Sequence, residues 1–281
     1  MGYNVMLTSN MSSTLYSLQQ ISDLMSSTNN NLATGKSVNS ALDDPVNYFA
    51  SEEHLDRADD LQGRKDEMSE AIQLVTTANN GVEALLDLID SIQSLANSAL
   101  TATDQTEINS LEAQFSDILK QMDQIVDDSY YKGTNLLGGA TETLDVFFNP
   151  DGSSMLTLTG EDASFTGLSI TDLVTDDWWD ATNGVADKTA INASLDQLID
   201  AKTELRTMAQ NLSLDLSTIE IRQDFTSEMI TALTDGASNL VSADANEESA
   251  TLLMLQTQQS LAINSLSIAS DSYQSVLQLF S

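Results

Sequence analysis

LLMLQTQQSLAINSLSIASDSYQSVLQLF, residues 252–280, is the stretch of sequence that decides the fold. It carries one charged side chain, Asp271, and is otherwise a mixture of apolar residues with Ser, Gln, Thr and Asn. Apolar and small residues recur in steps of three, four and seven, at 252, 255, 262, 266, 269, 273, 276 and 280. This spacing is typical of a helix that packs along another helix. The stretch therefore predicts a C-terminal helix that needs a helical partner.

The first 35 residues have the same character as this C-terminal stretch. They carry one charged side chain, Asp23, and apolar residues recur at 7, 11, 18, 21, 25 and 32. All but two of the 43 acidic residues lie between Lys36 and Glu248. Uncharged ends suit the interior of an assembly, because repeated like charges repel at close range. We therefore expect self-assembly through Leu7, Met11, Leu18, Ile21, Met25, Leu32, Leu252, Leu255, Leu266, Tyr273, Val276 and Phe280.

The composition of the 281-residue chain excludes several classes of function. Its net charge of -33 argues against binding to nucleic acid, which needs a basic surface, and against anionic membrane surfaces. Since it contains no cysteine, it has no disulfide, thiol nucleophile or thiolate metal site. Two prolines and 5% aromatic residues favour long helices over a compact globule.

The beginning of the sequence, MGYNVMLTSN, has neither a basic segment nor the apolar segment of a secretory signal. No apolar run reaches the roughly 18 residues that cross a membrane. We therefore expect no membrane insertion and, for an exported protein, secretion without a cleaved signal peptide.

The middle of the chain predicts helices over about 46–100, 105–128 and 188–233, with Thr103 and Asp104 breaking the first from the second. Between them, TLDVFF and MLTLTG flank the turn NPDGS, which predicts a hairpin with Pro150 at the first central turn position and Gly152 at positive φ. ASFTGLSI, residues 163–170, is a candidate third strand. Turn-rich stretches before Pro45 and over 234–249 read as hinges.

The resulting fold is mainly α, with long antiparallel coiled-coil helices from the N- and C-terminal thirds and a small β-hairpin insert. We divide the chain into an N-terminal inner-core helix (1–35), hinge and shaft helices (36–140), the hairpin insert (141–187), a C-terminal shaft helix (188–235), and a hinge with the C-terminal inner-core helix (236–281).

The stretch LATGKSVNSALDDPVNYFAS, residues 32–51, resembles the hinge signature of bacterial flagellins. GVEALLDLIDSIQSLANSAL and YKGTNLLGG look like the helix and loop that follow it, and residues 250–280 are similar to the flagellin C-terminal helix. Together these pieces cover roughly residues 1–140 and 188–281. Pro45 is a departure, because many flagellins have Ala there, and Asp-Asp-Pro also suits the related hook-filament junction protein.

The resemblance implies a structural subunit that polymerises into the bacterial flagellar filament for motility, with the hook-filament junction protein as the alternative. It implies a helical homopolymer in an extracellular location. The implied partners are the flagellar type III export apparatus, an export chaperone, the filament cap and hook-junction proteins. The short insert implies little outer decoration.

The candidate chemical sites favour structural roles, and we expect no catalytic residue, cofactor or metal. His54, the only histidine, lies on a helix among acids, where a solvated or ion-paired side chain is expected. DDWWDATNG, residues 176–184, lacks the ligand spacing of a calcium loop. Adjacent acids on a helix point apart and read as solvated faces. Trp178 and Trp179 are expected to cover the apolar face of the hairpin, or to meet a neighbouring subunit. An acidic coiled-coil enzyme or a cation buffer are the alternatives from other classes.

Overall fold

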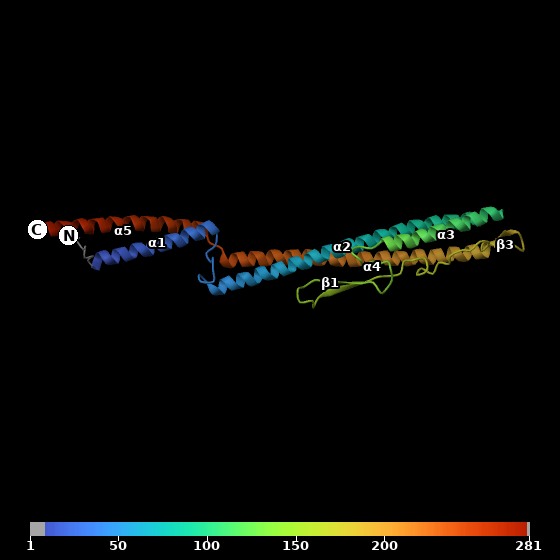
Figure 1. The fold of residues 1–281 in the computed structure, drawn as a ribbon, viewed down its shortest axis with the longest axis horizontal. Coiled ribbons are helices and arrows are strands. Elements are labelled where there is room, and N and C mark those ends of the chain that lie inside the picture. Colours follow the sequence, from blue (N-terminus) through green and yellow to red (C-terminus); the bar gives the residue numbers. More distant parts are fainter. Residues whose placement is uncertain (1–8, 280–281) are drawn as a thin grey trace. The chain divides into compact units, whose positions relative to one another are not determined.

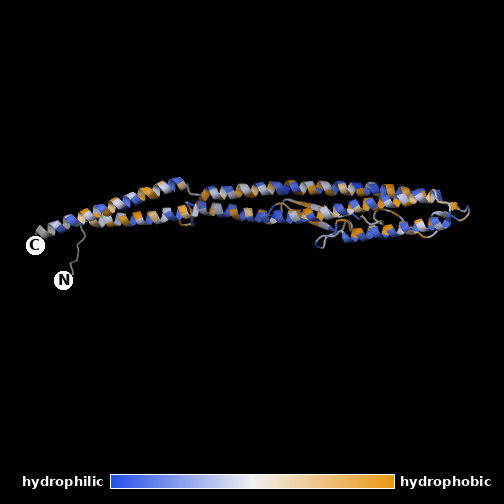
Figure 2. Ribbon diagram, turned by 90° about the horizontal axis from the view of Figure 1, so that it is seen from above, coloured by the Kyte–Doolittle hydropathy of each residue, from blue (hydrophilic) through white to orange (hydrophobic). Residues whose placement is uncertain are grey.

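The computed structural model describes residues 9–279, which fold into two compact units. Of the described residues, 9–58 and 231–279 belong to one unit, and residues 59–230 form the other. The described part contains five helices and two small two-stranded sheets. Figure 2 shows hydrophobic and hydrophilic residues alternating along the helices, as expected for helices that each have one packed side.

The terminal unit is built on α1 (Ser9–Thr34) and α5 (Ala245–Leu279), which run antiparallel along each other (Figure 1). The beginning of α2 (Pro45–Ala99) and the end of α4 (Lys188–Val241) belong to the same unit. The pairing of α1 with α5 confirms the expected non-local packing of the N- and C-terminal helices.

Polar side chains set the ends of these helices. α1 ends at Gly35, whose φ of 69° is in the left-handed region and whose N–H bonds to the carbonyl of Asn31 at 2.8 Å. Asp44 precedes Pro45 and accepts the N–H of Val46 at 3.0 Å, so it caps the start of α2. Asp244 caps α5 in the same way.

The second unit has one continuous core made by α2, α3 (Gln105–Asp128), α4 and the insert. Asp104 is the N-cap of α3 and accepts the N–H of Thr106 at 2.9 Å, which confirms the expected break before this helix. On α3 the most deeply buried apolar residues are Ile108, Phe115, Leu119, Met122 and Val126, and the partly buried Leu111, Ile118 and Ile125 pack against the same core.

The hairpin pairs β1 (Thr143–Phe147) with β2 (Met155–Thr159) in antiparallel register, Val146 opposite Leu156. Its turn follows the expected chemistry. Gly152 has a φ of 71° and donates to the carbonyl of Asn149 at 3.3 Å. A second, shorter pair joins β3 (Trp179–Asp180) to β4 (Val185–Ala186).

The expected third strand over 163–170 is wrong. This segment forms hydrogen-bonded turns instead, with Ile170 donating to the carbonyl of Phe165 at 2.9 Å. The backbone at Gly167 lies so close to Asp162 that a Cβ would stand 2.4 Å from it, which favours glycine and a tight turn. The apolar side chains of Leu168 and Ile170 still reach the core.

α4 is longer than expected, because it continues to Val241 through Gly236 and the turn-like residues that read as a hinge. Ala237 and Val241 are buried there, and the Ser51 hydroxyl donates to the Ala237 carbonyl at 3.1 Å. Tertiary packing thus outweighs the roughly 1 kcal/mol helix penalty of glycine. The connection between α4 and α5 is only residues 242–244.

Candidate assembly surfaces

The expected self-assembly residues whose side chains are described lie mostly on the packed side of the α1–α5 pair. Met11 and Leu255 are buried, and Leu32 is just exposed. The others are half-buried, namely Leu18, Ile21, Met25, Leu252 and Leu266. Leu7 and Phe280 lie outside the described residues, and the side chains of Tyr273 and Val276 are not described. Within one chain, the buried and half-buried members of this set therefore help to hold α1 and α5 together.

A second apolar row on α5 remains exposed and was missed at the sequence level. Met254, Leu261 and Ile268 are 51%, 61% and 67% exposed and recur every seven residues, so they follow one side of the helix. Leu253 and Ile263 are also exposed on α5, with Ile263 on the opposite side of the helix from this row, and α1 adds further exposed apolar residues, Leu15, Tyr16 and Leu24. The spacing of seven residues from 254 can be read in the sequence. The same stretch also contains the apolar spacing that starts at 252, on which the prediction was based.

A network of hydrogen bonds ties the turn after α1 to the turn before α5. Ser37 donates its backbone N–H to the carbonyl of Val241 at 2.8 Å, and Ala243 donates to the carbonyl of Gly35 at 3.0 Å. The side-chain amide of Asn31 donates to the Glu248 carboxylate at 2.9 Å. The turn after α1 and the turn before α5 are therefore joined by hydrogen bonds between their backbones and side chains.

The first hinge continues into a compact turn around Asp43. Its carboxylate accepts the backbone N–H groups of Asn39 at 3.0 Å and Ser40 at 2.9 Å, together with the Ser40 hydroxyl. The bond from Asn39 is the main reason why the pKa of Asp43 is lowered from its usual value. The ionised carboxylate thus fixes the loop that leads into α2.

The insert is anchored by Trp178, which is fully buried. Its ring meets Phe115 of α3 edge-on at 5.1 Å, and its indole N–H donates to the Ser194 hydroxyl of α4 at 3.1 Å. The expectation that both tryptophans cover the hairpin face is therefore wrong for Trp178, because α3 and α4 provide its pocket. Trp179 is half-buried beside it.

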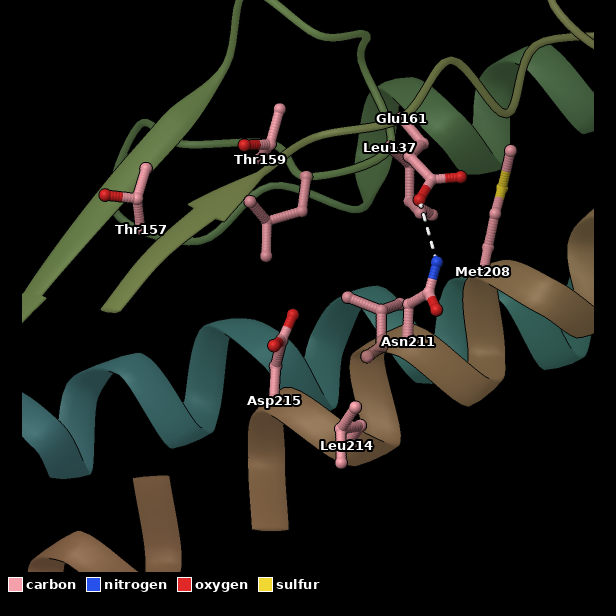
Figure 3. Close-up of a pocket in the computed structure, with 10 residues that line it drawn as sticks. Leu137, Thr157, Thr159, Glu161, Met208, Asn211, Leu214 and Asp215 are labelled. Atoms are coloured by element: carbon pink, nitrogen blue, oxygen red, sulfur yellow. Dashed lines mark hydrogen bonds between the residues drawn. The ribbon is translucent and has the colours of Figure 1, made fainter. Parts of the chain in front are cut away.

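A pocket of about 270 Å³ lies between the hairpin and α4 (Figure 3). Thr157 and Thr159 line it from β2, and Asn211 of α4 donates to Glu161 across it at 3.3 Å. Asp215 projects from α4 toward the same space, and burial raises the pKa of its carboxyl group. The residues that line this pocket include no histidine, and the hydroxyl of Thr157 donates to the carboxylate of Asp145 on the paired strand β1 at 2.6 Å.

Asp180 and His54 are the remaining candidate chemical groups. Asp180 lies in the segment that lacks the ligand spacing of a calcium loop, and it accepts hydrogen bonds from Asn183 and Thr182. The bond from the Asn183 side chain is the largest cause of its lowered pKa. His54 is half-buried, with its Cδ2 3.9 Å from the position of a Cβ on Gly236. Within residues 9–279 no group of three or more His, Asp or Glu side chains could hold a metal ion. In the same part of the chain, no helix is long and apolar enough to cross a membrane.

Comparison with known proteins identifies the family. The model of the bacterial flagellin N-terminal helical region matches residues 5–142. Flagellin FljO of Caulobacter vibrioides is 28% identical over 96% of this chain and 96% of its own length. A flagellin of Brucella melitensis is 27% identical over 96% of this chain and 97% of its own. The crystal structure of Bacillus cereus flagellin is 13% identical, with a TM-score of 0.46 over 57% of this chain and 88% of that one.

The N-terminal match and the relatives aligned over nearly the whole chain agree with the paired terminal helices and the small insert. Nothing in these comparisons favours the hook-filament junction alternative. The chain belongs to the bacterial flagellin family, whose members are structural subunits of the flagellar filament.

Proposed function

We propose that this flagellin polymerises through the α1–α5 pair, with the exposed row of Met254, Leu261 and Ile268 as a principal contact between subunits. The supporting observation is that a nearly uncharged helix pair carries large, exposed apolar side chains at every seventh residue of α5 from Met254 to Ile268. Burying apolar surface contributes about 25 cal/mol per Å². In a polymer the same contact is repeated by every subunit.

The expected seam residues support this role indirectly. Met11 and Leu255 are buried where α1 packs against α5. They therefore fix the exposed row on α5 in position relative to α1. Leu7, Tyr273, Val276 and Phe280 continue the same sequence registers, so we include them in the proposed assembly surface.

The finer partners follow from the family role. We propose export through the flagellar type III apparatus without a cleaved signal peptide, guided by an export chaperone, with assembly beneath a filament cap onto hook-junction proteins. The absence of cysteine suits passage as an unfolded chain, because no disulfide can cross-link it. We propose that the protein has no catalytic activity.

The test compares two exposed leucines with similar exposure. Leu261→Asp places a charge on the proposed contact, whereas Leu214→Asp places the same charge on α4 in the acidic middle of the chain, where Leu214 is 67% exposed. Both changes carry the same helix propensity cost. We expect Leu261→Asp to abolish filaments seen by electron microscopy, while Leu214→Asp leaves them intact. Normal filaments from Leu261→Asp would overturn the proposed contact.

A further inference from the structure

The turn before α2 presents a large apolar side chain to solvent. Leu42 is 95% exposed, and Val46 and Phe49 on the first turns of α2 are 76% and 63% exposed. The turn that carries Leu42 is well ordered by hydrogen bonds, since the Leu42 N–H donates to the Ser40 hydroxyl at 3.3 Å and Asp43 binds Ser40. Leu42 is therefore held away from the protein by the fold.

The same unit contains a groove that no side chain fills. It has a volume of about 270 Å³ and lies between the beginning of α2, the end of α4 and the turn at residues 34–36. Ser51, Leu55, Ala237, Ser238 and Val241 line it. The volume is below the roughly 300–1,000 Å³ of small-molecule sites, so it suits a single inserted side chain.

The walls of this groove are fixed by hydrogen bonds. The Ser51 hydroxyl joins α2 to the carbonyl of Ala237 on α4, and Ser37 and Val38 donate to the carbonyl of Val241. A preformed groove loses little conformational entropy when it is filled. Because Leu42 is almost fully exposed, it does not occupy the groove of its own chain.

Charge favours a second copy of this chain as the occupant. Asp43 and Asp44 directly follow Leu42 in the sequence, and Lys36 lines the groove. When Leu42 enters the groove of another copy, these opposite charges approach each other, whereas most of the chain is acidic and would repel that copy.

We propose that Leu42 of one subunit inserts into this groove of the next subunit, with Asp43 and Asp44 near its Lys36. A projecting apolar side chain and a complementary groove on different parts of one surface make a head-to-tail contact that does not close into a dimer. Such a contact generates an open helical polymer. The inference rests on the proposed function, because it adds a second contact to filaments that the α1–α5 pair also holds.

Cysteine cross-linking tests the contact, since the native chain has no cysteine to interfere. In Leu42→Cys with Ser238→Cys, the two sulfurs can bond only if the contact brings the Cα atoms within about 4.4–6.8 Å. The control pair is Leu42→Cys with Ala232→Cys, because Ala232 is exposed on α4 but does not line the groove. Full-length variants are polymerised under reducing conditions, oxidised and separated by mass.

We expect a ladder of covalent multimers from the Leu42–Ser238 pair, and at most dimers from either single variant and from the control pair. Filaments that form normally but yield no ladder, or an equal ladder from the control pair, would overturn the contact while leaving the α1–α5 proposal intact.

A second comparison keeps the inference testable if cysteine at position 42 impairs assembly. Ser238→Trp fills the groove, whereas Ala232→Trp adds the same side chain outside it. We expect the critical concentration for polymerisation to rise at least tenfold for Ser238→Trp only, with unchanged helical content. Equal critical concentrations for the two variants would contradict the contact.

Discussion

The carboxylate of Glu112 accepts a hydrogen bond from the backbone N–H of Trp178 at 2.5 Å. Its other oxygen accepts the N–H of Asp176 at 3.0 Å. Glu112 lies on α3 and is only 2% exposed. This buried acid therefore binds the backbone just where Trp178 enters the core, and it fixes the end of the insert to the helices.

This anchor makes the stability of the second unit depend on pH. Burial raises the pKa of Glu112, with further raising by Asp177 and Asp176 and opposition from the two backbone hydrogen bonds. A carboxyl group whose pKa is raised by folding stabilises the fold fully below its unfolded pKa, about 4.3. That contribution is lost as the pH rises through the raised folded pKa.

We therefore expect the free energy of unfolding of the unmodified chain to fall, relative to Glu112→Gln, as the pH rises from about 4 toward neutrality. Gln keeps the shape of the side chain but does not titrate. Urea unfolding followed by the fluorescence of Trp178 and Trp179 measures both proteins at each pH. A difference between them that stays constant with pH would contradict the role assigned to Glu112.

Trp178→Ala should destabilise the second unit by about 3–5 kcal/mol, because it leaves a cavity beside Phe115 and removes the indole N–H that donates to the Ser194 hydroxyl. Trp179→Ala is the matched control, since Trp179 is only half-buried and should cost clearly less. Urea unfolding followed by circular dichroism compares the two. Equal losses for both variants would show that burial at 178 is not what anchors the insert.

The helices and the hairpin could be predicted from sequence because their signals are local. Asp104 caps α3 where the polar break indicated, and Gly152 takes the positive φ that the turn requires. The end of α4 could not be predicted this way. Gly236 and its polar neighbours resemble a loop, but the non-local burial of Ala237 and Val241 favours the helix.

The assembly surface could be predicted only in part, because the apolar spacing is local whereas the packing of the two helices is not. The apolar spacing that contains Leu255 predicts one apolar side of α5, and this side is covered by the packing of α1 against α5. Which apolar residues remain free for other subunits depends on how the two helices face each other. The spacing from Met254 to Ile268 can be read in the sequence, but the exposure of this row and the groove near Ser238 follow only from the packing of the helices.

Polymerisation should depend strongly on salt, because subunits with a net charge of -33 repel each other when they pack side by side. The Debye length falls from about 30 Å at 0.01 M to about 10 Å at 0.1 M salt, so added salt screens this repulsion. We expect the yield of sedimentable polymer to rise over this range. A flat yield would mean that local pairs of opposite charge already neutralise the contacts.

Two glycines inside α2 should respond in opposite ways to replacement by alanine. A Cβ on Gly63 would meet no atom within 4 Å, so Gly63→Ala should stabilise the chain by up to about 1 kcal/mol through helix propensity.

On Gly81 a Cβ would lie 2.4 Å from the hydroxyl of Ser129 and 2.8 Å from Leu137. Ser129 cannot move freely, because its hydroxyl donates to the carbonyl of Ile125 at 2.6 Å. Gly81→Ala should therefore overpack this contact and destabilise the chain by about 1–3 kcal/mol, despite the better helix propensity of alanine. Urea unfolding of the two variants measures both effects. Stabilisation by Gly81→Ala would mean that α2 and the loop at residues 129–137 pack less closely than the structure places them.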